Sequence, residues 1–183
     1  DVEDDHGLYF VHPNIAQAAD DLEVEFERFR RWIAFHEVTH AAEFGAAPWL
    51  GAYLSDRLHA VVSELAERRL PEEQFAELDL AMTAVEGYAE LLMDQAFDDE
   101  YEDLRRKLDA RRRGGSPLSK LIRRLLGFQL KRRQYERGRA FFEAVVDARG
   151  IQGAAVLWEA PAHLPRQYEL EDPDRWLGRV PTV

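Results

Sequence analysis

Apolar side chains recur every three or four residues along most of the chain, which is the spacing of a helix with one buried face. Gly and Pro interrupt this pattern and predict where helices end. The pattern predicts helices over residues 24–44, 49–69, 72–97 with a break near 78, 101–113, 117–128 and 129–149. Residues 7–15 are the best strand candidate, and the proline-rich tail after residue 159 predicts short turns.

These elements predict a mainly α fold with little or no β-sheet. The length of 183 residues is that of one domain, so we expect a single domain over 1–183 with the Gly114–Pro117 loop inside it. Hydrophobic residues make up 46% and charged residues 32%, a globular balance. The chain has no cysteine, which excludes disulfides and thiolate metal sites, so any transition-metal site must use His, Asp and Glu.

No apolar run approaches the length of a membrane span, and the acidic start "DVEDDHGLYF" is unlike a signal peptide. That start lacks Met and enters in the middle of a pattern. We therefore expect the C-terminal portion of a longer chain, located in the cytoplasm.

The net charge of -11 is unevenly distributed. Residues 105–139 hold fourteen Lys and Arg against Asp109 and Glu136, a local balance of +12, which leaves -23 elsewhere. Such asymmetry can mark a surface for nucleic acid or anionic lipid. The simpler interpretation, which we favour, is a basic face that docks on the acidic body or is solvated.

The most informative short motif is "FHEVTH", in the helix predicted over 24–44. His36 and His40 are four residues apart, so they lie on one face and can reach the same metal ion. Glu37 lies one step round the helix, the general-base position of the H-E-x-x-H arrangement. Phe29 and Ala41 are expected on the same apolar face as the histidines.

A catalytic zinc needs a third protein ligand, and the H-x-x-G-x-x-H extension is absent, because Glu43 stands in the Gly position and Ala46 in that of the third His. The ligand must therefore come from elsewhere in the chain. The candidates are His59, Glu64, Glu86, Asp94 and His163.

Glu86 is the strongest candidate, because it lies at the edge of an apolar arc where an unpaired carboxylate is costly. Gly87 beside it allows another backbone or a ligand to approach closely. Glu90, one turn later, can accept a hydrogen bond from the outer nitrogen of a ligand histidine. A set of two His and one Glu favours zinc. His59 remains an alternative ligand.

The motif His36-Glu37-x-x-His40, followed by Glu86 and Glu90, resembles the gluzincin pattern of thermolysin-like metallopeptidases, although the later acidic residue there is usually Asp. A wider resemblance covers almost the whole chain. Its segments are "LYFVHPNI", "WIAFHEVTHAAEF", "PWL", "VEGYAELLMD", "KRRQYERGRAFFEAVV", "LWEAPAHLP" and "DPDRWLGR". They are similar to an uncharacterised actinobacterial and chloroflexi family of zincin-like hydrolases, some labelled as associated with deazaflavin-cofactor biosynthesis.

This resemblance implies a zincin-like helical metallopeptidase domain with zinc on His36, His40 and Glu86. A peptide or another small hydrolysable molecule would be the substrate. Side chains that could hold a developing oxyanion are Tyr88, Tyr135 and His163. The competing hypothesis is a non-catalytic domain with a structural metal, whose basic segment 105–139 binds nucleic acid or an anionic partner. The segment has few aromatic residues, which weakens this alternative. The sequence leaves the oligomeric state open.

Overall fold

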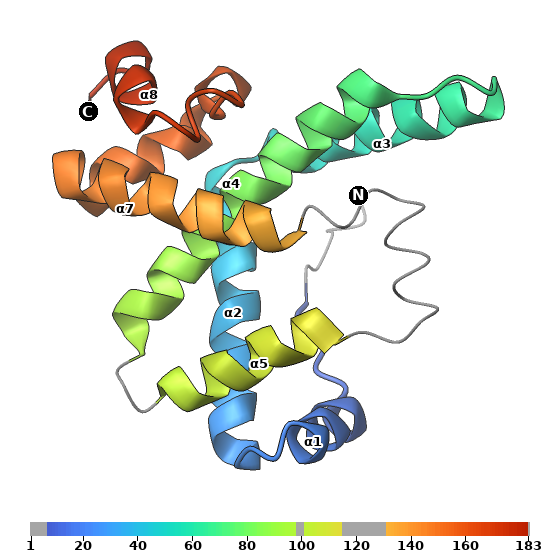
Figure 1. Ribbon diagram of the computed structural model, residues 1–183, viewed down its shortest axis with the longest axis vertical. Coiled ribbons are helices and arrows are strands. Elements are labelled where there is room, and N and C mark those ends of the chain that lie inside the picture. Colours follow the sequence, from blue (N-terminus) through green and yellow to red (C-terminus); the bar gives the residue numbers. More distant parts are fainter. Residues whose placement is uncertain (1–6, 98–100, 115–130, 183) are drawn as a thin grey trace.

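The computed structural model describes residues 7–97, 101–114 and 131–182, and every regular element in these ranges is helical (Figure 1). The predicted mainly α fold is therefore confirmed for the described residues. The helices are α1 (His12–Asp21), α2 (Phe26–Ala46), α3 (Leu50–Ala66), α4 (Glu72–Ala96), α5 (Glu102–Gly114), α7 (Lys131–Ala155) and α8 (Pro173–Arg179), with 3-10 turns η3 (Val156–Glu159) and η4 (Pro161–His163). Among the described helices, none is long and apolar enough to cross a membrane.

The strand predicted over residues 7–15 is wrong, because α1 begins at His12 within it. Pro13 lies in the first turn of the helix, where its fixed φ suits the helix and its missing N–H costs nothing. Residues 7–11 are exposed, and the described part of the chain offers no strand for them to pair with. Apolar packing of the helix, through Ala19 and the following Leu22, outweighs the β-prone side chains at its start.

The helix that carries the histidine pair has clear local causes for both of its ends. Glu25 caps α2, because its carboxylate accepts hydrogen bonds from the backbone N–H groups of Glu27 and Arg28 at 3.0 and 2.8 Å. The helix ends at Ala46, shortly before Pro48, as predicted. The break predicted near residue 78, in the helix expected over 72–97, is wrong, since α4 runs from Glu72 to Ala96. The helix predicted over 117–128 lies outside the described residues.

The interior consists of two apolar clusters. The larger joins α3, α4, α7 and the C-terminal turns around Phe141, Phe142 and Trp176, all fully buried. The smaller joins α1, α2 and α5 around Phe29 and Leu104. In Figure 1, α2 runs between the two ends of the molecule, and α3 and the first half of α4 project as a hairpin to one side.

Two glycines set how closely α4 and α7 cross. A Cβ on Gly87 would lie 2.6 Å from the carbonyl carbon of Gly138, and a Cβ on Gly138 would lie 2.5 Å from the carbonyl oxygen of Thr83. The close backbone approach expected at Gly87 is therefore confirmed, and the partner is α7. This crossing fixes the part of α4 that carries Glu86.

Candidate metal centre

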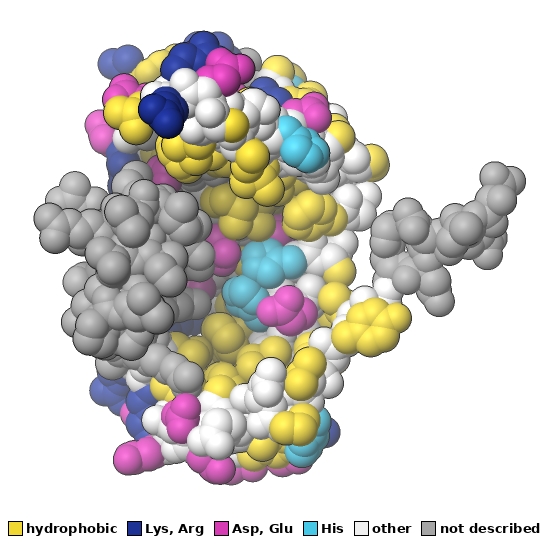
Figure 2. All heavy atoms as spheres, turned by 90° about the vertical axis from the view of Figure 1, so that its right-hand side faces the viewer, with side chains coloured by type: hydrophobic (Ala, Val, Ile, Leu, Met, Phe, Trp, Pro, Cys, Tyr) yellow, Lys and Arg dark blue, Asp and Glu magenta, His cyan; other side chains and the backbone are white. Residues whose placement is uncertain are grey.

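His36 and His40 lie one above the other on α2, as their spacing predicts. Their rings meet edge to face with centroids 4.5 Å apart, and Trp32 stacks on the outer side of His36 at 5.1 Å. Their side chains are 14% and 19% exposed, so each ring is held by packing but remains reachable from solvent. In Figure 2 the adjacent pair of histidines lies in a hollow of the surface, with an acidic side chain beside it and hydrophobic side chains around it.

Glu86 approaches the histidines from α4, which packs against α2. One of its oxygens, Oε2, lies 3.9 Å from His40 Nε2. Ligand atoms of His36, His40 and Glu86 all lie within 4.8 Å of one another, and this is the group in the described part of the chain that could hold a metal ion. Two imidazoles and one carboxylate form a donor set suited to zinc.

Glu37 stands beside this cluster without belonging to it. Its Oε1 lies 3.7 Å from His36 Nδ1, and its side chain is 49% exposed. The carboxylate thus faces solvent next to the three side chains that could hold a metal ion. A group in this place can exchange protons with water at the site.

Glu43 is a site residue that the sequence reasoning missed. It follows His40 by one helical turn, and its Oε2 lies 2.8 Å from His40 Nδ1. The side chain is 1% exposed. Its helical spacing of three from His40 is a signal that could have identified it.

Burial and mutual interaction shift the pKa values of this pair. Burial raises the pKa of Glu43 to about 7, although the hydrogen bond and charge of His40 act in the opposite direction. Burial lowers the pKa of His40, but Glu43, with smaller contributions from Glu86 and Glu37, outweighs it and raises the value overall. The raised pKa of His40 therefore reflects the carboxylates around it, whereas the raised pKa of Glu43 reflects its burial.

Two buried carboxylate oxygens near the cluster have no hydrogen-bond partner among the described residues. They are Oε1 of Glu43 and Oε2 of Glu90. An unpaired buried carboxylate is costly, so the surroundings favour a cation, and the donor set fits a divalent metal. The hydrogen bond expected between Glu90 and a ligand histidine stays a prediction for His36, whereas Nδ1 of His40 lies against Glu43 instead.

The structure does not bring the other candidate ligands into this group. His59 is exposed on α3, where its Nδ1 lies 3.5 Å from Ser55 Oγ. His163 Nδ1 lies 2.7 Å from the carbonyl oxygen of Val156. Asp94 forms ion pairs with Arg105 and with Arg139, the latter at 3.0 Å. Glu64 lies on α3 outside the metal-binding group.

Among the oxyanion candidates, Tyr88 is the one near the cluster. It is 8% exposed and packs edge to face on Phe142 and Trp158, and burial, followed by the charge of Glu43, raises its pKa. The side chain of Tyr135 lies outside the described part of the structure.

The predicted position of Ala41 on the buried face of α2 is wrong, because the side chain of Ala41 is exposed.

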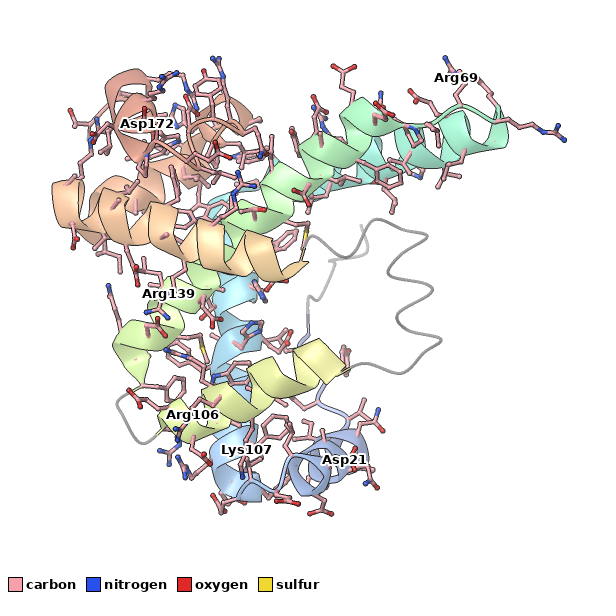
Figure 3. All side chains as sticks on the ribbon, in the orientation of Figure 1. Asp21, Arg69, Arg106, Lys107, Arg139 and Asp172 are labelled. Atoms are coloured by element: carbon pink, nitrogen blue, oxygen red, sulfur yellow. The ribbon has the colours of Figure 1, made fainter. Side chains whose placement is uncertain are left out.

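Described cations of the basic segment 105–139 interact within the chain. Lys107 Nζ donates to the carbonyl oxygen of Glu23 at 2.6 Å. Arg139 lies on the α7 face over α4 (Figure 3). Its Nε donates to Glu143 Oε1 at 2.7 Å, and it also pairs with Asp94. The remaining ion pairs are Arg105–Asp94, Arg106–Asp103, Lys107–Asp103 and Arg137–Glu171. These contacts agree with a basic face that docks on acidic parts of the same chain.

Comparison with known proteins finds one family and one solved structure that match most of the chain. The sequence matches the family described as zincin-like metallopeptidases over residues 1–73 and 61–177. The structure is similar to the crystal structure of a provisionally assigned hydrolase with a novel fold from Chloroflexus aurantiacus, with 36% identity and a TM-score of 0.75. The alignment covers 93% of this chain and 57% of that one, so the chain spans just over half the length of that protein. No curated protein matches the sequence.

Proposed function

The chain belongs to the zincin-like metallopeptidase family, and on this basis we propose that it is a zinc-dependent hydrolase that acts on a peptide or another small hydrolysable substrate. The observation that carries the proposal is the convergence of His36, His40 and Glu86 from two helices within 4.8 Å. The sequence order of these residues resembles a gluzincin site. The proposal extends to zinc as the metal, because two imidazoles and a carboxylate are its usual catalytic ligands.

Zinc bound by these side chains would polarise a substrate carbonyl and lower the pKa of water at the site toward about 7. Glu37 would act as the general base, because its carboxylate lies beside the metal-binding group and is open to solvent. Its carboxylate oxygen would accept a proton from the attacking water. It would then donate that proton to the leaving group, as a general base and acid does. The hydrophobic side chains around the hollow in Figure 2 would contact the substrate.

The alternative of a non-catalytic domain with a nucleic-acid surface receives less support. That function needs unpaired cations to neutralise phosphates. The described cations of segment 105–139 engage in ion pairs or backbone hydrogen bonds inside the chain, such as Lys107 with Glu23 and Arg139 with Glu143. We therefore favour the hydrolase.

The test combines metal analysis with a cleavage assay. Purified protein should contain about one zinc per chain, and His36→Ala or Glu86→Ala should lose it, whereas His59→Ala should keep it. Incubation with a mixed peptide pool, followed by mass spectrometry, should reveal products from the wild type. Glu37→Gln should keep zinc but lose activity by about 100-fold or more, the usual scale of general-base catalysis. Equal activity of Glu37→Gln and wild type would contradict the assignment of the base.

A further inference from the structure

We infer that Glu43 is a positioning residue of the metal site, which holds the His40 ring so that Nε2 faces the metal-binding group. This inference rests on the proposed zinc site. The contact is direct, because Glu43 Oε2 lies 2.8 Å from His40 Nδ1. With Nδ1–H donating to the carboxylate, the opposite ring nitrogen is free of its proton and available as a ligand.

The direction of the His40 ring supports this role. Nδ1 meets Glu43 inside the protein, while Nε2 lies 3.9 Å from Glu86 Oε2 on the side of the cluster. A ring flip would exchange the two nitrogens and break the hydrogen bond to the buried carboxylate. Glu43 thus fixes both the tautomer and the orientation of one ligand, as carboxylates behind metal-bound histidines do in other proteins.

The cost of burying Glu43 argues that it serves the site rather than the fold. The side chain is 1% exposed, and its Oε1 has no hydrogen-bond partner in the described residues. A buried carboxylate with one oxygen unpaired destabilises a folded chain, and an apolar side chain of similar volume would remove this cost. A carboxylate here makes sense if its negative charge strengthens His40 as a ligand for a cation.

Glu43 also differs from what the gluzincin resemblance leads one to expect. That resemblance places the supporting acidic residue on the later helix, at Glu90. Here the carboxylate on His40 comes from α2 itself, three residues after the ligand. Helix α2 therefore carries the two candidate histidine ligands, the proposed base and the support of one ligand, and α4 adds Glu86.

The test separates metal affinity from stability. Zinc dissociation constants, measured by competition with a chromophoric chelator, should rise about 10- to 100-fold in Glu43→Leu. Metal-free Glu43→Leu should unfold at the same or a higher temperature than metal-free wild type. Glu43→Gln should lose less affinity, because its amide oxygen can still accept the hydrogen bond from His40. Glu64→Leu, a Glu replacement on α3 outside the metal-binding group, should bind zinc like the wild type.

Three results would overturn the inference, and they are distinguishable. Wild-type zinc affinity in Glu43→Leu, with affinity lost in His40→Ala, would remove Glu43 from the site and leave the proposed function intact. A loss of affinity matched by a lower unfolding temperature of the metal-free protein, in both Glu43→Leu and Glu43→Gln, would assign Glu43 to the fold. A wild type that binds no zinc would overturn the proposed function together with the inference.

Discussion

The crossing of α4 and α7 provides a stability test that depends on one methyl group. Gly138→Ala adds a Cβ that would lie 2.5 Å from the carbonyl oxygen of Thr83 and 3.1 Å from the Cα of Gly87. Ordinary van der Waals contact begins near 3.4 Å, so the two helices must separate locally by about 0.9 Å. The neighbours are backbone atoms, which cannot move aside as the end of a side chain can. The substitution therefore disturbs the helix pair rather than one rotamer.

The expected magnitude follows from two opposing effects. Overpacking of a well-packed interior costs about 1–3 kcal/mol, and contact with rigid backbone favours the upper part of this range. Ala gains about 1 kcal/mol over Gly in helix propensity. The net loss for Gly138→Ala is then about 2 kcal/mol in free energy of unfolding. For a chain of this size, that loss lowers the melting temperature by about 4–8 °C.

The matched control is Gly51→Ala, because Gly51 is also helical but has no heavy atom within 4 Å of an added Cβ. Here a propensity gain of at most about 1 kcal/mol remains, because Gly51 lies in the first turn of α3, so the melting temperature should rise by up to about 2–4 °C. Thermal unfolding of the metal-free proteins, followed by circular dichroism, measures both changes. A Gly138→Ala variant as stable as Gly51→Ala would refute the close crossing and with it the argument for how α4 is placed.

Three further predictions use the same assay. Asp94→Ala should lower the melting temperature by about 2–4 °C, because the ion pairs of Asp94 with Arg105 and Arg139 are worth about 1 kcal/mol. These pairs connect α5 and α7 to α4, so amide hydrogen exchange in α5 should accelerate. Glu169→Gln should cost about 2–3 kcal/mol at neutral pH, because it removes the negative charge that the buried Glu169 places against Arg179 and leaves only a neutral hydrogen-bond acceptor there. Burial favours neutral Glu169, but hydrogen bonds from Arg179 and the Arg166 N–H outweigh it and lower the pKa. The ion pair therefore stabilises the protein above the unfolded pKa near 4.5, and the difference between wild type and variant should shrink as pH falls below that value. Zinc at 100 times its dissociation constant should raise the wild-type melting temperature by about 5–10 °C, and a chelator should reverse the rise, whereas His36→Ala should show neither effect.

The sequence predicted those parts of the structure that depend on local spacing. The helix carrying His36 and His40 was placed within two residues at each end, because apolar periodicity, Gly45 and Pro48 act within a few residues. Glu86 was identified by a different local signal, a carboxylate at the edge of an apolar arc. The structure brings it to the histidines, as expected.

What the sequence did not predict depends on contacts between distant segments. Part of the strand expected over residues 7–15 is instead the start of α1, whose apolar side packs with α2 and α5, which no local pattern reveals. Ala41 was predicted on the buried face because a helical wheel shows which residues share a face. It does not show how much of that face the neighbouring helices cover. The spacing of Glu43 from His40 is a local signal, but the burial of its side chain results from packing in the folded chain.

The position of His36, His40 and Glu86 between the two apolar clusters means that an ion bound there would stabilise both ends of the fold. Phe29, near the start of α2, belongs to the smaller cluster, whereas Ala47, at its end, belongs to the larger. His36 and His40 lie between them, and Glu86 comes from the middle of α4, next to Val85 of the larger cluster. A metal held by these three side chains would link α2 to α4 at the junction of the clusters, so its binding energy opposes their separation. The same link would neutralise the carboxylates gathered there, which the metal-free chain must keep close at an electrostatic cost.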